Sequence, residues 1–438
     1  MSDEKEEKKI KDFAEEVKIK IPEYLAPVKA DSTKIKEALD NLLALEKKTR
    51  LAADVDSTIE VSKAILNLCK ENKEWKLVNE HITLLCKRRA QLTRVISTVV
   101  KEGMAMLDDT PDKDTKKDLI ETLRAVSEGK LVVELERARL TRQLVQMKED
   151  AGEIAEAAEI LGDVTVETIG SMEIQEKAQF LQDQMRLCLA NKDYVRAEIV
   201  SKKIKPASLD KEELQDLKLS YYKLMVELYE YQKNYLAIAQ AYEKVFHTPK
   251  VQDDEKAWSS AWANAIEFLA LAQFDSEVSD MLERFKKESK TEKLPAHKQV
   301  LVDLTTIELM EWPLQGEQTF KNSDVFKGKE ERWKELHRRV VQHNIRVVSS
   351  YYTRITSSRL AELLQLDGDA AEECLSDMVS NKQVFAKINR CAGTIKFQQK
   401  QTPNQVLNDW AGDISNLLTL VDKTCHLINK ENMIHGLA

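Results

Sequence analysis

The stretch that decides the fold of the C-terminal third lies between Thr356 and Phe397 and reads TSSRLAELLQLDGDAAEECLSDMVSNKQVFAKINRCAGTIKF. Its first half predicts two helices. Thr356-Ser357-Ser358 can cap a short helix that runs through Leu364, and Asp367-Gly368-Asp369 can cap another that ends near Ser380. Short polar side chains suit these positions because they accept hydrogen bonds from the free N–H groups of a first helical turn.

A long helix precedes this stretch and a hairpin ends it. Glu330 to Tyr352 has the periodicity of one amphipathic helix. Val384–Arg390 and Thr394–Phe397 are rich in β-forming residues and flank the turn Cys391-Ala392-Gly393, whose glycine suits a left-handed position. Helix, short helix, helix and hairpin follow one another in the order of a winged helix. The apolar stripe of the long helix consists of Trp333, Leu336, Val340, Val347, Val348 and Tyr351.

A final helix is predicted from beyond Pro403 to about Lys430. Its apolar residues alternate at spacings of three and four, which is typical of a coiled-coil seam about 33 Å long at about 1.5 Å per residue. Two interpretations remain open: the seam packs against the chain's own body, or it enters a bundle with other chains. The seam residues are Leu407, Trp410, Ile414, Leu417, Val421 and Ile428.

Upstream, apolar residues recur at helical spacing from Ser32 to about Phe285. Polar turns precede Trp75, Tyr194 and Tyr235, and an aromatic residue then opens a second apolar helix. Joints recur at intervals near 40 residues, the length of one antiparallel helix pair, so we predict a right-handed α-solenoid of TPR-like helix pairs. An irregular all-helical domain is the alternative. The chain has only 11 glycines and 8 prolines in 438 residues, which also favours long helices with short joints.

These patterns predict four regions and a mostly α fold. Residues 1–20 form a charged, frayed or partly helical tail, and residues 21–315 form the helical-repeat solenoid. Residues 316–400 hold the winged helix with its linking helix at 330–352, and Gln315 to Lys329 is expected to be a loop. Residues 401–438 hold the C-terminal helix.

Composition excludes several classes of protein. The formal net charge of −8 disfavours a nucleic-acid-binding surface, which usually needs net positive charge. The second helix of the winged helix would place Asp369, Glu372, Glu373 and Asp377 against DNA phosphates. Six dispersed cysteines without a C-x-x-C pair indicate reduced thiols in the cytoplasm or nucleus. The first twenty residues lack a secretory signal, and no apolar run approaches the length of a membrane span.

The sequence contains no constellation typical of an enzyme. Gly129-Lys130 and Gly328-Lys329 both lack the earlier glycine of a P-loop, and no H-E-x-x-H pair is present. His337 and His343 are six residues apart on one helix, which places them on opposite faces, so they are not expected to bind one metal ion together. We therefore expect no catalytic residue, no metal ligand and no cofactor site.

Several segments carry a resemblance to a known family. They are RWKELHRRVVQHNIRVVSSYYTRITSSRLAELLQL from Arg332, FAKINRCAGTIKFQ, LNDW, HLINKENMIH, ELERARLT and MRLCLANKDYVRA. In these segments, and over nearly the whole chain beyond the first twenty residues, the sequence resembles the PCI-domain subunits of the 26S proteasome lid. That family combines a helical-repeat arm with a winged helix.

The resemblance implies a set of partners. Subunits of this family associate side by side through their winged-helix sheets, and their C-terminal helices form one bundle. Other PCI subunits, the metalloisopeptidase subunit and its MPN partner, the ATPase ring and the core-particle α-ring are the expected partners in a hetero-oligomer without nucleic acid or membrane. The bundle interface would use the six seam residues above. The sheet-edge interface would use Val384, Phe385, Ile388, Ile395 and Phe397.

The implied function is that of a non-catalytic structural subunit of the proteasome lid. It would scaffold lid assembly and place the deubiquitinase relative to the ATPase ring for ubiquitin-dependent degradation, in the cytoplasm and nucleus. The alternative is a PCI scaffold subunit of the COP9 signalosome.

Overall fold

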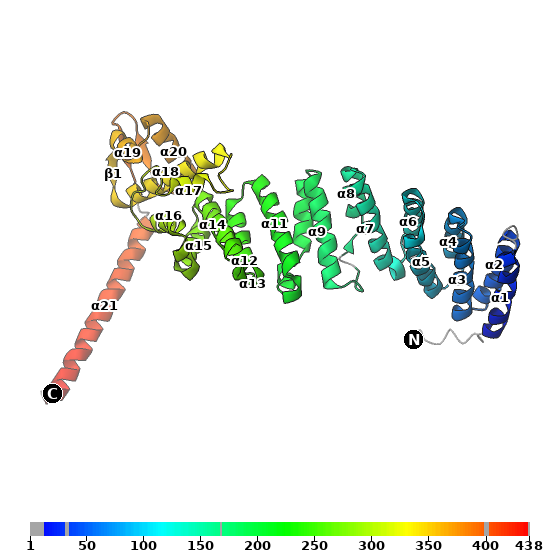
Figure 1. Cartoon of the computed structure of the whole chain (residues 1–438). Coiled ribbons are helices and arrows are strands. Elements are labelled where there is room, and N and C mark those ends of the chain that lie inside the picture. The colour runs from blue at the N-terminus through cyan, green and yellow to red at the C-terminus, as the bar shows by residue number, and fades with distance from the viewer. Residues whose placement is uncertain (1–12, 31–34, 167–168, 398–402, 437–438) are drawn as a thin grey trace. The chain divides into compact units, whose positions relative to one another are not determined.

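A computed structural model describes residues 13–30, 35–166, 169–397 and 403–436 (Figure 1). The described chain is mostly helical and divides into two compact units, residues 1–232 and 233–438. No described helix is long and apolar enough to cross a membrane. The first twelve residues of the predicted tail, and the residues that join the winged helix to the last helix, lie outside the described ranges.

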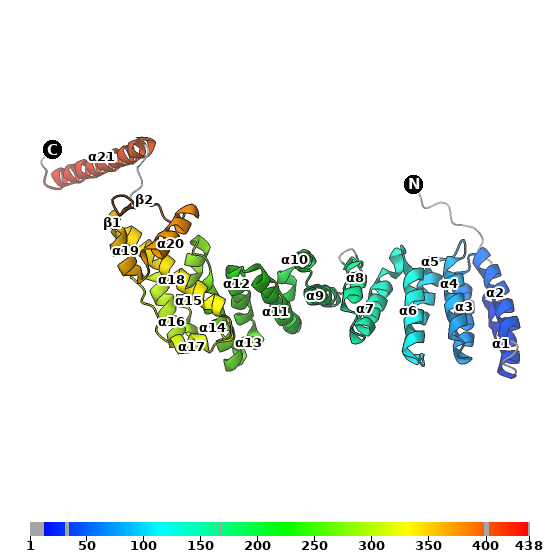
Figure 2. The same cartoon turned by 90° about the horizontal axis from the view of Figure 1, so that it is seen from above.

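The N-terminal unit is a series of helices that pack against their neighbours in the order of the sequence, as Figure 2 shows for α2 to α7. The turn 72–74 joins α3 to α4 and the turn 191–193 joins α9 to α10, so the two helices of each of these pairs are antiparallel. This is the solenoid predicted from the joint spacing. Its helices are α1 (Ala14–Ala30), α2 (Ile35–Leu51), α3 (Val55–Glu71), α4 (Trp75–Lys87), α5 (Thr93–Ala105), α6 (Lys113–Ser127), α7 (Glu134–Asp150), α8 (Ile154–Gly162), α9 (Ile174–Ala190), α10 (Tyr194–Lys203) and α11 (Gln215–Gln232).

Two of the joints predicted from the sequence share one backbone conformation. Lys73 and Lys192 follow helices α3 and α9 with φ of +56° and +60°. The N–H of Lys192 donates to the carbonyl of Leu189 (2.9 Å), and the N–H of Asp193 donates to the carbonyl of Cys188 (2.8 Å). These bonds satisfy carbonyls that the helix end leaves free, and they reverse the chain within three residues. The left-handed residue is lysine where glycine is usual.

Replacing Lys192 should therefore show how much the left-handed position matters. Lys192→Val should lower the free energy of unfolding by about 1–2 kcal/mol, because a β-branched side chain clashes in that conformation. Lys192→Gly should stay within about 0.5 kcal/mol of the wild type, because relief of strain is offset by a more flexible unfolded chain. Hydrogen exchange of α9 and α10 measures both, and equal protection in the two variants would contradict the prediction.

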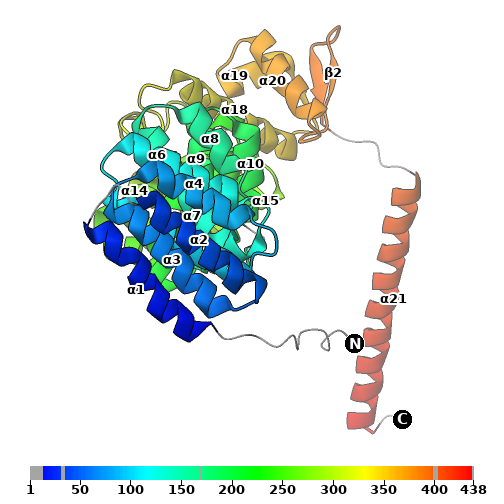
Figure 3. The ribbon, with the colours of Figure 1, turned by 90° about the vertical axis from the view of Figure 1, so that its right-hand side faces the viewer.

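The predicted tail at residues 1–20 overlaps the first helix of the solenoid. Helix α1 begins at Ala14 and packs against α2 and α3 (Figure 3). Val17 is fully buried, and Asp54 accepts a hydrogen bond from the N–H of Phe13 at 3.1 Å. Residues 14–20 thus belong to the solenoid, because Val17 completes an apolar core that the surrounding charges conceal in the sequence.

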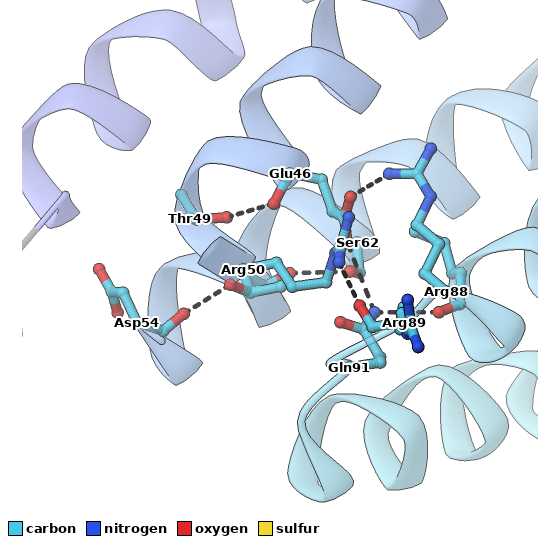
Figure 4. A network of polar contacts seen from close by, with 10 residues as sticks. Glu46, Thr49, Arg50, Asp54, Ser62, Arg88, Arg89 and Gln91 are labelled. Carbon is cyan, nitrogen blue, oxygen red and sulfur yellow. Dashed lines mark hydrogen bonds and ion pairs between the residues drawn. The ribbon is translucent and has the colours of Figure 1, made fainter. Parts of the chain in front are cut away.

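A buried ion pair network fastens α2 to the segment after α4 (Figure 4). The Glu46 side chain has no exposed surface and forms ion pairs with Arg50 (3.1 Å) and Arg88. Gln91 adds a hydrogen bond to Glu46 at 3.5 Å and one to the carbonyl of Leu85 at 3.0 Å. A carboxylate survives burial only with such partners, so each member depends on the others.

The second unit begins with further helices and ends with the winged helix and a single long helix. Trp262 is its largest fully buried side chain and lies between Phe246 and Phe285, with ring centroids 4.2 and 4.4 Å away. Its indole N–H donates to the Thr291 hydroxyl at 2.9 Å, so the polar edge is satisfied. The helices are α12 (Tyr235–Phe246), α13 (Pro249–Asp253), α14 (Glu255–Leu271), α15 (Ser276–Lys287), α16 (Pro295–Thr305), α17 (Glu317–Lys321), α18 (Glu330–Tyr351), α19 (Ser357–Leu364), α20 (Gly368–Ser380) and α21 (Pro403–Ile434).

The segment predicted as a loop at 315–329 contains helix α17. Phe320 on this helix is buried and packs on the ring of His297, with centroids 4.9 Å apart. Gly316 precedes the helix with φ of +85°, and an added Cβ would meet Ala296 at 3.2 Å. The loop prediction was wrong for these five residues because one buried aromatic side chain outweighs the polar composition.

Three strands complete the winged helix: β1 (Arg354–Thr356), β2 (Lys387–Asn389) and β3 (Thr394–Lys396). They form an antiparallel sheet in the order β1-β3-β2. Ile395 pairs with Ile355 on one side and Ile388 on the other. The predicted hairpin is confirmed in shorter form, because residues 384–386 lie outside β2. The helices predicted after Thr356 and Asp367 are present, and the Thr356 hydroxyl accepts a capping hydrogen bond from the N–H of Arg359, whereas the Asp367 side chain makes no such bond.

Candidate protein-interaction surfaces

The winged-helix sheet buries most of the side chains predicted for its edge. Ile395 lies on the central strand and is 2% exposed, and Val384 and Phe397 are also buried. Phe385 and Ile388 are half-buried. A central strand has both neighbours in place, so Ile395 offers no free backbone to another chain. Ile395, Val384 and Phe397 belong instead to the core of the module, which contradicts their placement at an edge.

The free edges of the sheet belong to β1 and β2. Among the described residues each of these strands pairs only with β3, so the outer side of β2 remains available for strand addition. Strand β1, which is only three residues long, was not predicted from the sequence. Its signal was the alternation Arg354-Ile355-Thr356, of which only Ile355 is buried. The N–H of Phe397 extends the pairing to the carbonyl of Thr353 at 3.1 Å.

Helix α20 presents an acidic face. Of its four carboxylates, Asp377 pairs with Arg338 at 2.6 Å and Glu372 pairs with Arg390 at 2.5 Å. Both arginines come from within the same unit, and α20 itself contains no lysine or arginine. These two ion pairs offset half of the four negative charges and hold α20 to α18 and to the segment after β2.

Helix α21 presents an apolar surface that no other described residue buries. All of its described residues are exposed. This favours the second of the two interpretations of the seam, because the helix buries no residue against its own chain. The six predicted seam residues retain these exposed fractions: Leu407 57%, Trp410 63%, Ile414 40%, Leu417 62%, Val421 49% and Ile428 54%.

Two arginines of α7 form ion pairs with carboxylates of α9. Arg139 pairs with Glu176 at 2.7 Å, and the hydrogen bond from Arg139 lowers the pKa of that carboxyl. Arg142 pairs with Asp183 at 2.8 Å. These pairs join α7 to α9 within the solenoid.

The histidines lie apart, as their spacing predicted. His343 is buried, and burial lowers its pKa to about 4; its Nε2 lies 3.1 Å from the carbonyl of Glu308. His337 packs on the ring of Trp312, with centroids 4.7 Å apart, and burial lowers its pKa as well. Within the described ranges, no group of three or more His, Cys, Asp or Glu side chains could hold a metal ion.

One buried group contains the residue types of a hydrolytic triad in an unproductive order. Ser323 donates to Glu267 at 2.5 Å, and His297 Nε2 lies 2.9 Å from the other carboxylate oxygen. A serine nucleophile needs histidine as its direct base, whereas here the carboxylate lies between the two. Glu267 and His297 are 1% and 5% exposed, so the group ties α14 and α16 to the segment after α17.

Comparison with known proteins assigns the three regions separately. Residues 37–254 match the family model described as PSMD12/CSN4, N-terminal, and residues 309–399 match the PCI domain model. Residues 404–436, which are most of α21, match the model of the 26S proteasome regulatory subunit RPN5 C-terminal domain.

Full-length relatives decide the assignment. The chain is 43% identical to 26S proteasome non-ATPase regulatory subunit 12 of Dictyostelium discoideum, over 93% of this chain and 92% of the relative. It is 38% identical to homolog A of that subunit in Arabidopsis thaliana (93% and 99%) and 36% identical to 26S proteasome regulatory subunit RPN5 of Saccharomyces cerevisiae (98% and 97%). The chain belongs to this family of proteasome regulatory subunits.

Membership in the non-ATPase regulatory subunit 12 family confirms the resemblance seen in the sequence. The N-terminal model covers two related groups under one description, so it does not separate the proteasome from the alternative. The C-terminal model and the names of the full-length relatives do, and both point to the proteasome. In this family α21 is thus a recognised domain of its own.

Proposed function

We propose that this chain is a non-catalytic scaffold subunit of the proteasome lid that holds its neighbours through α21 and the winged-helix sheet. The observation that carries the proposal is the uncovered apolar seam of α21. Burying its six seam side chains is worth on the order of 10 kcal/mol, at about 1.5–3 kcal/mol each. That stabilisation can offset the cost of association and of ordering the helix, so a bundle with several sibling helices is the expected state.

The partners are the remaining PCI subunits of the lid, the metalloisopeptidase subunit and its MPN partner, the ATPase ring and the core-particle α-ring. By joining them, the chain places the deubiquitinase relative to the ATPase ring for ubiquitin-dependent degradation. The buried polar groups around Glu46 and Glu267 tie helices together rather than face a cleft, which supports a non-catalytic role. Cytoplasm and nucleus are the proposed locations. The COP9 signalosome alternative is not favoured by the named relatives.

Affinity capture tests the proposal. The tagged full-length chain should recover lid subunits, the ATPases and the core particle from cells, as identified by mass spectrometry. Recovery of a cullin-deneddylating complex without ATPases would reject the proteasome assignment. A chain that ends at residue 402 provides the control, and it should lose most of these partners while its solenoid remains folded.

A further inference from the structure

A cavity of about 230 Å³ lies in the second unit between α15, the end of α16 and α18. Much of its wall is apolar, formed by Leu282, Leu304, Ile307 and Val347. Arg346 of α18 also lines it and is half-buried. A guanidinium in such a setting normally has an acidic partner, because desolvation of an unpaired charge is unfavourable.

Arg346 has no carboxylate partner among the residues that the structure describes. Its guanidinium carbon lies 3.5 Å from the centroid of the Phe274 ring, a cation–π contact. Its other polar contact runs from Nη2 to Nδ1 of His343 at 3.4 Å. Two other arginines on the same helix differ, since Arg338 pairs with Asp377 at 2.6 Å and Arg339 with Glu335 at 2.5 Å.

His343 cannot supply the missing negative charge. Its Nε2–H donates to the carbonyl of Glu308, which leaves Nδ1 as a bare acceptor facing Arg346. Burial lowers the pKa of His343 to about 4, so the imidazole is neutral at physiological pH. Burial, followed by the charge of Arg339, lowers the pKa of Arg346 to about 10, so the guanidinium remains charged.

The geometry leaves donors free for a ligand. Phe274 covers a face of the guanidinium and His343 engages a single nitrogen, whereas a guanidinium has five N–H donors in its plane. A carboxylate can accept two of these donors side by side. The apolar wall suits the aliphatic stem of an acidic side chain.

We propose that this cavity receives the carboxylate of a glutamate or aspartate side chain from a neighbouring polypeptide, with Arg346 as its ion partner. The choice of a polypeptide rests on the proposed scaffold function. Glu283 also lines the cavity and would repel a doubly charged phosphate more than a singly charged carboxylate. The contact is predicted to fix the register of a partner on the α15–α18 face.

The test uses the full chain, deuterated and labelled with ¹⁵N-arginine. N-acetylglutamate α-amide should give a saturable shift of the Arg346 Nε resonance, which the Arg346→Met variant assigns by its loss. The uncharged N-acetylglutamine α-amide should bind at least ten-fold more weakly. Inorganic phosphate should also bind more weakly than the carboxylate probe, and tighter phosphate binding would overturn the choice of an acidic side chain.

Variants separate binding from folding. Arg346→Met should melt within about 2 °C of the wild type, because it removes an unpaired charge. Arg346→Lys keeps the charge but loses the planar fork, and it should weaken probe binding several-fold. Arg338→Met is the matched control and should respond like the wild type. Absence of a saturable shift in the wild type would refute the pocket and leave the capture result intact, because the titration needs no partner subunit.

Discussion

The double substitution Leu417→Asp with Val421→Asp should block entry of the chain into the proteasome lid. Both residues lie on the exposed seam of α21, 62% and 49% exposed. In a bundle each carboxylate would be forced into an apolar interface without a partner, which costs several kcal/mol per charge. We expect recovery of lid subunits to fall at least 100-fold in affinity capture.

The matched control is Ser415→Asp with Thr419→Asp. It adds the same two charges at the same spacing on the opposite face of the helix. This control should assemble nearly as well as the wild type. Because α21 buries no residue against the rest of the chain, circular dichroism should show both variants folded. Normal assembly of the seam variant would refute the bundle role of α21.

The Glu46→Ala substitution should have the largest effect on the solenoid. It removes a carboxylate with no exposed surface and leaves Arg50 and Arg88, which are 10% and 21% exposed, without their ion partner. Removing one member of a buried ion pair costs about 3–5 kcal/mol. Hydrogen exchange in α2, α3 and α4 should accelerate correspondingly, since these helices share one core.

Two further variants serve as comparisons for Glu46→Ala. Glu37→Ala removes an exposed glutamate from the same helix and should change stability by less than about 0.5 kcal/mol. Glu46→Gln keeps the shape and part of the hydrogen bonding, so its effect should be intermediate. Equal protection of α2 in Glu46→Ala and the wild type would show that the network is dispensable.

Much of the helical architecture could be predicted from periodicity and turn chemistry. Long stripes such as the one from Trp333 to Tyr351 leave little ambiguity, and the polar joints before Trp75 and Tyr194 end helices as expected. Errors arose where a tertiary contact outweighs local composition. Val17 is buried within a charged segment, and Phe320 orders a helix in a polar one.

The candidate surfaces were predictable to different degrees. The apolar seam of α21 could be predicted from residue spacing alone, because apolar residues at alternating spacings of three and four fall on one face of a helix. The edge strands of the sheet could not be predicted in the same way, because strands of three residues have almost no recognisable sequence pattern. The unpredicted strand β1 pairs with β3 and so makes β3 the central strand. Arg346 was also missed, because Phe274 and His343 approach it only in the folded unit.

Hydrogen–deuterium exchange of α21 in the free chain and in the assembled complex tests the central claim most directly. A helix without tertiary contacts is marginally stable, so residues 403–434 should exchange rapidly in the free chain. Assembly should slow their exchange at least 100-fold if sibling helices cover the seam. Equally rapid exchange in the assembled complex would contradict the account.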